Sequence, residues 1–252
     1  MIFDTHSHYD DKAFDEDRES LLVSLEENGI GNIVCVGADM KSSKAAMELA
    51  HSYEFAYAAV GVHPSDTAPL TETDMEWLEQ ASHDEKVVAI GEIGLDYYYD
   101  THPKELQRFW FRQQLRLAEE TNLPVIIHSR DASQETFDII KASSVRRGSI
   151  HCYSGSAQMA LDYVKMGFSI GVGGVVTFSN AKKLVETVAA IPMESILIET
   201  DCPYLAPNPN RGKRNDSTNL KYVVEKIAEI KNLPPETVAE ISEKNAKSLF
   251  FK

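Results

Sequence analysis

Short, continuous apolar segments recur along the chain, and longer stretches with apolar residues at helical spacing lie between them. Continuous apolar segments that alternate with helices indicate a parallel sheet whose strands are buried on both faces. Eight segments fit this description. The sequence therefore predicts strands at Ile2–Asp4, Ile33–Gly37, Ala56–Gly61, Val87–Gly91, Val125–Ile127, Ser149–Ile150, Ser169–Val172 and Ser195–Ile198.

Two of the intervening stretches show the helical pattern most clearly. Residues 103–122 place Leu106, Trp110 and Leu117 near one helical face, after a proline that suits a helix start. Residues 233–250 repeat the amphipathic pattern at the end of the chain. We therefore expect helices between the strands and after the last one.

Eight strand–helix units in 252 residues match a (β/α)₈ TIM barrel, and we expect a single domain over residues 1–252. The alternative is an open doubly wound sheet, but no glycine-rich phosphate-binding turn follows the first strand. Two connections, residues 92–103 and 201–219, are long. Long loops in a compact domain are usually functional, and in a barrel they lie at the carboxyl ends of the strands.

Charge and cysteine content narrow the possible functions. The net charge is −14, from 25 basic and 39 acidic residues, which argues against a protein that coats nucleic acid by charge alone. Cys35, Cys152 and Cys202 are odd in number and far apart, so a reducing compartment is indicated rather than a disulfide framework. We see neither a secretory signal nor an apolar run of about 20 residues, and we expect a cytoplasmic protein without membrane association.

Metal-binding residue types collect where the predicted strands end. His6 and His8 follow the first strand, and residues two apart on a strand point to the same side. The other strand ends supply five more such residues, namely His63, Glu92, His128, His151 and Asp201. Packed together without a ligand, these groups would be desolvated and would need many hydrogen bonds. Neutral histidine binds divalent metal well, so the pattern predicts a metal site.

The number of donors indicates two ions rather than one. A single catalytic metal usually keeps three protein ligands and a water molecule. Six donors suit two ions bridged by a carboxylate, and Glu92 is the expected bridge. We assign His6, His8 and Asp201 to one ion, and His128 and His151 to the other. The identity of the ions, Mg²⁺, Mn²⁺ or Zn²⁺, stays open.

Such a pair of ions lowers the pKa of bound water and makes it a nucleophile, and we expect Asp201 to accept the proton of that water. Glu92 is a second catalytic candidate. His63 is not needed as a ligand, because the other six donors already suffice for two ions. It contacts a phosphate oxygen, protonates the leaving group, or serves only a structural role before Pro64, and the sequence leaves these alternatives open.

Basic and aromatic residues in the connections point to the substrate. Cationic side chains there grip phosphate groups, and aromatic rings stack on unpaired bases. The substrate-binding candidates are Arg130, Tyr153, Arg211, Lys213 and Arg214, and further aromatic residues lie at Tyr97, Tyr98, Tyr99 and Tyr204. Together they favour a single-stranded end over an intact duplex.

The ordered series "DTHSHYD", "GVHP", "GEIGLDYY", "PVIIHSRDA", "HCYSG" and "ETDCPYLAP" resembles the motifs of the TatD family of metal-dependent deoxyribonucleases. The resemblance extends from Phe3 to about Asn215. It implies an amidohydrolase-type TIM barrel, metal roles for His6, His8, Glu92, His128, His151 and Asp201, and hydrolysis of DNA phosphodiesters. It also implies exonuclease activity at 3′ ends, with DNA as the partner and no obligate protein partner.

Two other functions compete with the nuclease. The first is a small-molecule amidohydrolase that cleaves a lactone or cyclic amide on the same two-ion site. Relatives of that kind often bridge their metals with a modified lysine, whereas strand 4 here offers Glu92. The second is a non-catalytic metal-binding or scaffold protein, which needs no open water position.

Overall fold

The computed structural model describes residues 1–98 and 103–251. Each of the eight predicted apolar segments overlaps a strand. The strands are β1 (Ile2–Ser7), β2 (Ile30–Val36), β3 (Ala56–Val60), β4 (Val87–Asp96), β5 (Val125–Arg130), β6 (Gly148–Ile150), β7 (Phe168–Val172) and β8 (Ile196–Ile198).

The strands are hydrogen-bonded in chain order from β1 to β8 in one sheet, and helices alternate with them. The helices in the described part of the chain are α1 (Arg18–Ser24), α2 (Met40–Ser52), α3 (Glu72–Ala81), α4 (Lys104–Thr121), α5 (Ser133–Ala142), α6 (Ala157–Lys165), α7 (Lys182–Ala190), α8 (Leu220–Lys231) and α9 (Pro235–Phe250). This order is that of the (β/α)₈ TIM barrel, and the predicted fold class is confirmed.

The chain divides into two compact units, which are described separately. Unit 1 comprises Met1–Val34, Cys152–Lys165 and Ser169–Lys252, and unit 2 comprises Cys35–His151 and Met166–Phe168. The expectation of one domain over residues 1–252 stays a prediction.

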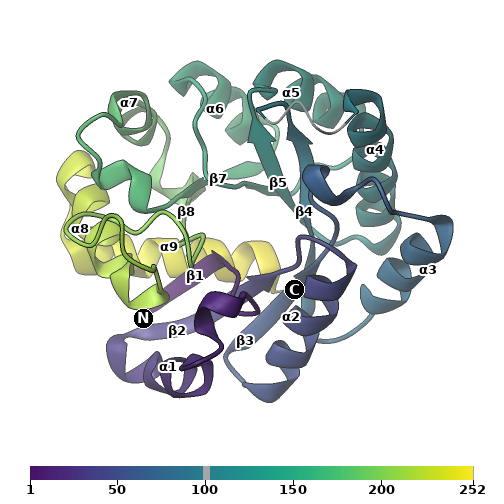
Figure 1. Ribbon diagram of the computed structural model, residues 1–252. Helices are drawn as coiled ribbons and strands as arrows, with labels where there is room; N and C mark the ends of the chain where they lie inside the picture. The colour runs from purple at the N-terminus through teal and green to yellow at the C-terminus, as the bar shows by residue number, and fades with distance from the viewer. Residues whose placement is uncertain (99–102, 252) are drawn as a thin grey trace. The chain divides into compact units, whose positions relative to one another are not determined.

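In unit 1, the first and last strands lie against the C-terminal helix. α9 packs on β1 and β8, and the ring of Phe3 lies 6.0 Å from that of Phe250 (Figure 1). β7 pairs with β8 in parallel, and Ser7 forms a bridge with Cys202. The N-terminal strand is thereby joined to the segment that follows the eighth strand.

In unit 2, four consecutive strands pair in parallel register, and helices cover their outer side. β3 pairs with β4, β4 with β5, and β5 with β6. α2 packs on β3 and α4 packs on β4. The predicted face of α4 is buried at Trp110 and Leu117. These parallel pairs bring the carboxyl ends of the strands to one edge of the unit.

Local sequence signals fix the helix ends. Asp39 precedes α2, and its carboxylate accepts a hydrogen bond from the backbone N–H of Ser42 at 2.6 Å. α4 ends at Asn122 and α8 ends at Asn232, and both asparagines adopt the left-handed conformation. Asparagine tolerates this conformation better than most residues, so both helices stop there.

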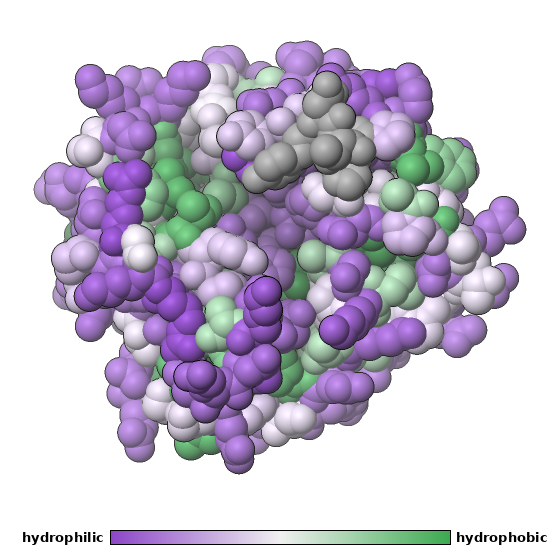
Figure 2. All heavy atoms as spheres, viewed as in Figure 1, coloured by the Kyte–Doolittle hydropathy of each residue, from purple (hydrophilic) through white to green (hydrophobic). Residues whose placement is uncertain are grey.

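The surface is predominantly polar in the view of Figure 2, where hydrophobic residues form small, separate groups. Among the described residues, every helix falls short of the length and apolarity needed to span a membrane. Cys35 and Cys202 are buried, Cys152 is partly exposed, and none of the three is in a disulfide.

We predict that Gln114→Leu strongly destabilises the fold. The amide of Gln114 is buried on α4, accepts a hydrogen bond from the N–H of Val62 at 2.7 Å and donates one to its carbonyl at 3.1 Å. Leucine leaves both backbone groups without a partner, at a cost of about 1–3 kcal/mol each. Equilibrium urea unfolding measures the loss. Gln113→Leu, at the neighbouring position, is the control and changes the free energy of unfolding by about 0.5 kcal/mol or less; equal losses in both variants would contradict the prediction.

Candidate functional site

Unit 1 gathers three predicted metal ligands. Nε2 of His6 lies 3.1 Å from Nε2 of His8, and Oδ1 of Asp201 lies 3.8 Å from the first and 3.5 Å from the second. His6 is fully buried, whereas the side chains of His8 and Asp201 are 13% and 19% exposed. Three donor atoms therefore converge, and His8 and Asp201 are partly exposed to solvent.

Backbone pairing between β1 and the segment after β8 holds this group. The N–H of Asp201 donates to the carbonyl of His6 at 2.9 Å, and the N–H of His8 donates to the carbonyl of Cys202 at 2.9 Å. Asp201 adopts a left-handed conformation, with φ of 56°. The three ligands are thus positioned by main-chain geometry rather than by their own side chains.

A buried acid supports the same segments. Asp4 accepts hydrogen bonds from the hydroxyls of Thr200 at 2.7 Å and Ser217 at 2.6 Å, and from the N–H of Thr200 at 3.0 Å. Burial raises the pKa of Asp4 to about 7, and these hydrogen bonds oppose the rise. Asp4 therefore ties β1 to the long connection after β8, a role that the sequence pattern leaves unassigned.

Unit 2 gathers the remaining donors around one carboxylate oxygen. Oε1 of Glu92 lies 2.8 Å from Nδ1 of His128, 3.7 Å from Nε2 of His151 and 4.0 Å from Nε2 of His63. Glu92 and His151 are buried, and His63 and His128 are partly exposed. His63, whose role the sequence leaves open, lies in this group, and its Nδ1 accepts a hydrogen bond from the N–H of Ser65.

Strand register explains the close approach of β4 and β5. Gly94 pairs with His128 and has φ of 148°, and a Cβ on Gly94 would collide with the carbonyl oxygen of His128. Glycine is therefore required where the two strands meet.

His6, Glu92 and His128 lie within their strands rather than after them, because β1, β4 and β5 extend beyond the purely apolar residues.

His128 lies between two carboxylates, and one of these was not predicted. Its Nε2 is 3.1 Å from Oδ2 of Asp96, on the opposite side of the ring from Glu92. Burial lowers the pKa of His128, but hydrogen bonds to Asp96 and Glu92 outweigh burial, and the net shift is upward. Burial likewise raises the pKa of Asp96, but hydrogen bonds from His128 and the N–H of Tyr98 prevail and lower it. The spacing of Glu92, Gly94 and Asp96 is the signal that points to Asp96.

Glu199 is a second carboxylate that the sequence interpretation missed. It is 1% exposed, follows β8 directly, and accepts a hydrogen bond from the N–H of Cys152 at 2.6 Å. Its position two residues before Asp201 is the one feature of the sequence that could have identified Glu199 as a residue near the site.

Both donor groups fit a divalent cation. In unit 1, two imidazole nitrogens and a carboxylate oxygen lie within 3.8 Å of one another. In unit 2, one buried carboxylate faces three imidazoles. Imidazole with carboxylate is a common ligand combination for Zn²⁺ and Mn²⁺, and an ion relieves the need for these groups to share protons.

The predicted substrate contacts are less uniform. The guanidinium of Arg130 is exposed and lies 3.7 Å from the centroid of the Tyr98 ring, and that of Arg211 lies 4.2 Å from the Phe178 ring. Lys213 is exposed and bonds Asn210 at 3.4 Å. All three side chains are exposed to solvent.

The other substrate candidates have structural partners. Arg214 donates to both carboxylate oxygens of Asp17, at 2.7 and 2.6 Å. Tyr153 is 5% exposed, and its hydroxyl donates to the carbonyl of Ser156 at 2.7 Å. Tyr99 lies outside the described residues.

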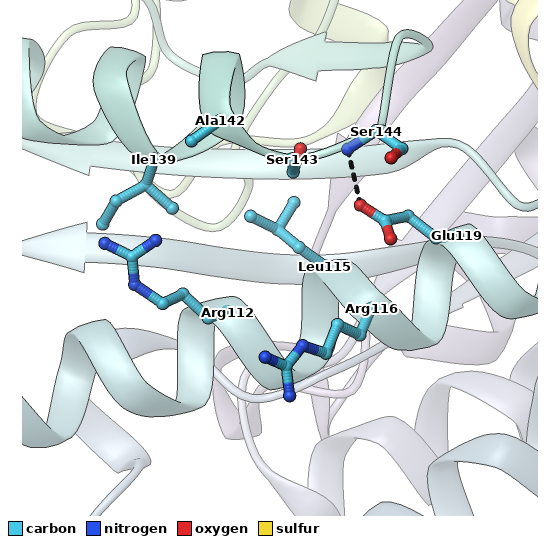
Figure 3. A pocket seen from close by; sticks show the side chains of 8 residues that line it. All are labelled: Arg112, Leu115, Arg116, Glu119, Ile139, Ala142, Ser143 and Ser144. Carbon is cyan, nitrogen blue, oxygen red and sulfur yellow. Dashed lines mark hydrogen bonds between the residues drawn. The ribbon is translucent and has the colours of Figure 1, made fainter.

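A cavity of about 230 Å³ on the outer side of unit 2 is separate from these donors. It lies between α4 and the end of α5, and its lining includes Arg112, Arg116 and Ser144, whose N–H donates to Glu119 (Figure 3). In parallel strand–helix units, helices end at the edge where the next strand begins. The cavity is therefore at the opposite edge of the unit from Glu92 and His128.

Comparisons with known proteins agree over the whole chain. The family model described as TatD related DNase matches residues 3–251. YabD, an uncharacterized metal-dependent hydrolase of Bacillus subtilis (strain 168), is 47% identical over 252 residues, which cover 99% of each chain. The crystal structure of YjjV, a TatD homologue from Escherichia coli K12, has a TM-score of 0.94 at 34% identity, covering 99% of this chain and 97% of that one. A TatD family hydrolase from Entamoeba histolytica has a TM-score of 0.89 at 25% identity, covering 99% and 98%.

We predict that Arg214→Gln raises the pKa of Asp17. The hydrogen bond from Arg214 and its charge lower that pKa below 3.8 in the folded protein. A lowered folded-state pKa means that the pair stabilises the fold above the unfolded-state pKa and loses this effect as pH falls through the folded-state value. Carboxyl ¹³C NMR titration measures the shift. Lys213→Gln is the control and leaves the Asp17 pKa unchanged; an unshifted Asp17 in Arg214→Gln would show that the ion pair is absent in solution.

Proposed function

The chain belongs to the TatD related DNase family of metal-dependent hydrolases, and from this membership we propose that it is a divalent-metal-dependent nuclease that hydrolyses phosphodiester bonds of DNA. We further propose exonuclease activity at the 3′ ends of single strands, in the cytoplasm. The observation that carries the proposal is the convergence of three imidazoles on Oε1 of Glu92.

Two ions are proposed, one for each donor group. His6, His8 and Asp201 would hold one, and His128 and His151 would hold the other, with Glu92 as the shared ligand predicted from the sequence. Divalent ions bound by such residues lower the pKa of water and stabilise negative charge on phosphate oxygens. Whether Mg²⁺, Mn²⁺ or Zn²⁺ is used follows from the assays below.

The residues of the chain then divide the remaining tasks. Asp201 is the proposed general base, because its carboxylate is partly exposed and its backbone is fixed by the carbonyl of His6. His63 is proposed to contact a phosphate oxygen or to protonate the leaving group through Nε2. Its Nδ1 is already occupied by the N–H of Ser65, which leaves Nε2 as the nitrogen that faces the donors.

Substrate binding is proposed for the exposed cations and rings beside the donors. The guanidinium of Arg130 lies over the ring of Tyr98, so a cation and an aromatic ring occur together, and Arg130 pairs with Asp96 across the sheet. Phosphate pairs with the first and an unpaired base stacks on the second. Lys213 and Arg211 add positive charge after β8, on a chain whose net charge is −14. Local cations on an acidic protein favour a short strand end over a long duplex.

We predict that chelator-stripped protein regains nuclease activity when a divalent metal is added. Mononucleotides are released from labelled single-stranded DNA faster than from duplex. Asp201→Asn and His128→Ala lower the rate by a factor of about 10² or more, because each removes a proposed metal ligand and Asp201→Asn also removes the proposed general base. His51→Ala, which changes an exposed histidine paired with Asp84, is the control and retains activity.

A panel of substrates distinguishes this function from its alternatives. If the protein cleaves a lactone or cyclic amide but leaves DNA, RNA and phosphate esters intact, it is a small-molecule amidohydrolase rather than a nuclease. Bound metal without turnover of any substrate would leave a metal-binding protein.

We predict that Arg130→Gln raises the KM for single-stranded DNA about fivefold with little change in kcat. The expected loss is about 1 kcal/mol, the upper range for an exposed charge pair. Steady-state kinetics at two salt concentrations measure it, since the effect shrinks at high salt. Arg112→Gln, in the cavity at the other edge of unit 2, is the matched control. The same KM in all three proteins would remove Arg130 from the substrate site.

A further inference from the structure

The imidazole of His128 is held from both sides by strand β4. Position 94 pairs with His128 and carries no side chain, and residues two before and two after it are Glu92 and Asp96. Side chains at these positions share a face of the strand. The ring of His128 therefore enters a gap between two carboxylates, with Nδ1 2.8 Å from Glu92 and Nε2 3.1 Å from Asp96.

Asp96 is itself fixed more firmly than an ordinary surface acid. It is 3% exposed, and its Oδ1 accepts a hydrogen bond from the N–H of Tyr98 at 2.9 Å. Its own N–H donates to Oε1 of Gln107, and its carbonyl accepts from Nε2 of Gln107, both at 2.9 Å. Gln107 is buried on α4. Hydrogen bonds within the chain thus hold Asp96 in place with Oδ2 toward His128.

We propose that Asp96 is the positioning residue that selects the metal-binding nitrogen of His128, an inference that rests on the proposed function. A neutral imidazole carries one N–H, and a carboxylate that accepts it fixes the tautomer. With Nε2–H donated to Asp96, the lone pair is on Nδ1, the nitrogen nearest Glu92. Asp96 also raises the basicity of Nδ1 through the ring.

A second histidine–acid pair in unit 2 provides a matched control. His51 and Asp84 lie 2.9 Å apart at their closest atoms, but the His51 side chain is 49% exposed. His51 belongs to neither donor group. Asp84→Asn and Asp96→Asn therefore make the same chemical change beside a histidine, and only the second touches a proposed metal ligand.

The test measures metal affinity and the tautomer of His128 rather than activity alone. Zn²⁺ and Mn²⁺ are titrated into chelator-stripped protein by isothermal titration calorimetry. Asp96→Asn is expected to weaken one bound ion about 10- to 100-fold, the usual effect of removing a carboxylate behind a ligating histidine. Asp84→Asn binds as the wild type does.

Long-range ¹H–¹⁵N NMR correlation of the zinc-loaded wild type gives a readout that needs no Asp96 variant. Resonances of His128 are assigned by their loss in His128→Gln. The expected spectrum shows a protonated Nε2 and a metal-bound Nδ1. A protonated Nδ1, or equal affinities in Asp96→Asn and the wild type, would overturn the proposal.

The outcomes separate this inference from the proposed function. Wild-type protein that binds metal through Nδ1 of His128 but leaves DNA intact would refute the nuclease and retain the role of Asp96. If the wild type is a metal-dependent nuclease but Asp96→Asn binds Zn²⁺ and Mn²⁺ as tightly as the wild type, the nuclease is retained and the role of Asp96 is refuted. Wild-type protein that binds no divalent ion would overturn both.

Discussion

Burial of a carboxylate among imidazoles is the constraint on which the functional end of unit 2 depends. Glu92 is 4% exposed, and three histidines face its Oε1. A buried charge is costly unless it is paired and hydrogen-bonded, so these residues specify one another's positions. The glycine opposite His128 meets this constraint sterically, because it lets β4 and β5 approach closely enough for both acids to reach one ring.

In unit 1, main-chain hydrogen bonds hold the proposed metal ligands in place. β1 and the segment after β8 exchange main-chain hydrogen bonds beside the ligand positions. The carboxylate of Asp4 also accepts hydrogen bonds from the hydroxyl and the N–H of Thr200 in that segment. Two histidines and Asp201 then converge with little freedom. The backbone pairing and the contacts of Asp4 thus fix the positions of these three side chains.

The residues proposed to bind substrate are held mainly by side-chain contacts. Apart from Arg130, which ends β5, the arginines and tyrosines proposed to bind substrate lie in connections. Several already have partners, as Arg214 has in Asp17 and Tyr153 has in Ser156. The guanidinium of Arg130 lies over the ring of Tyr98 and that of Arg211 over the ring of Phe178, and both arginines are exposed. The proposed metal ligands thus lie within or just after the strands, and most of the proposed substrate contacts lie in the connections, as is usual in this fold.

Hydrophobic periodicity by itself determined the eight strands and the order of the fold, because strands buried on both faces must be continuously apolar and the helices between them must be amphipathic. The same pattern marked the metal ligands, since histidines and acids that end apolar segments are conspicuous. Tertiary structure alone decided which nitrogen of His128 faces which acid, that Asp96 and Glu199 are buried beside the donors, and that Arg214 is already paired. Acids at and after the ends of apolar segments look alike in a sequence. Strand register and the missing side chain at Gly94 give them different partners, and those contacts join residues far apart along the chain.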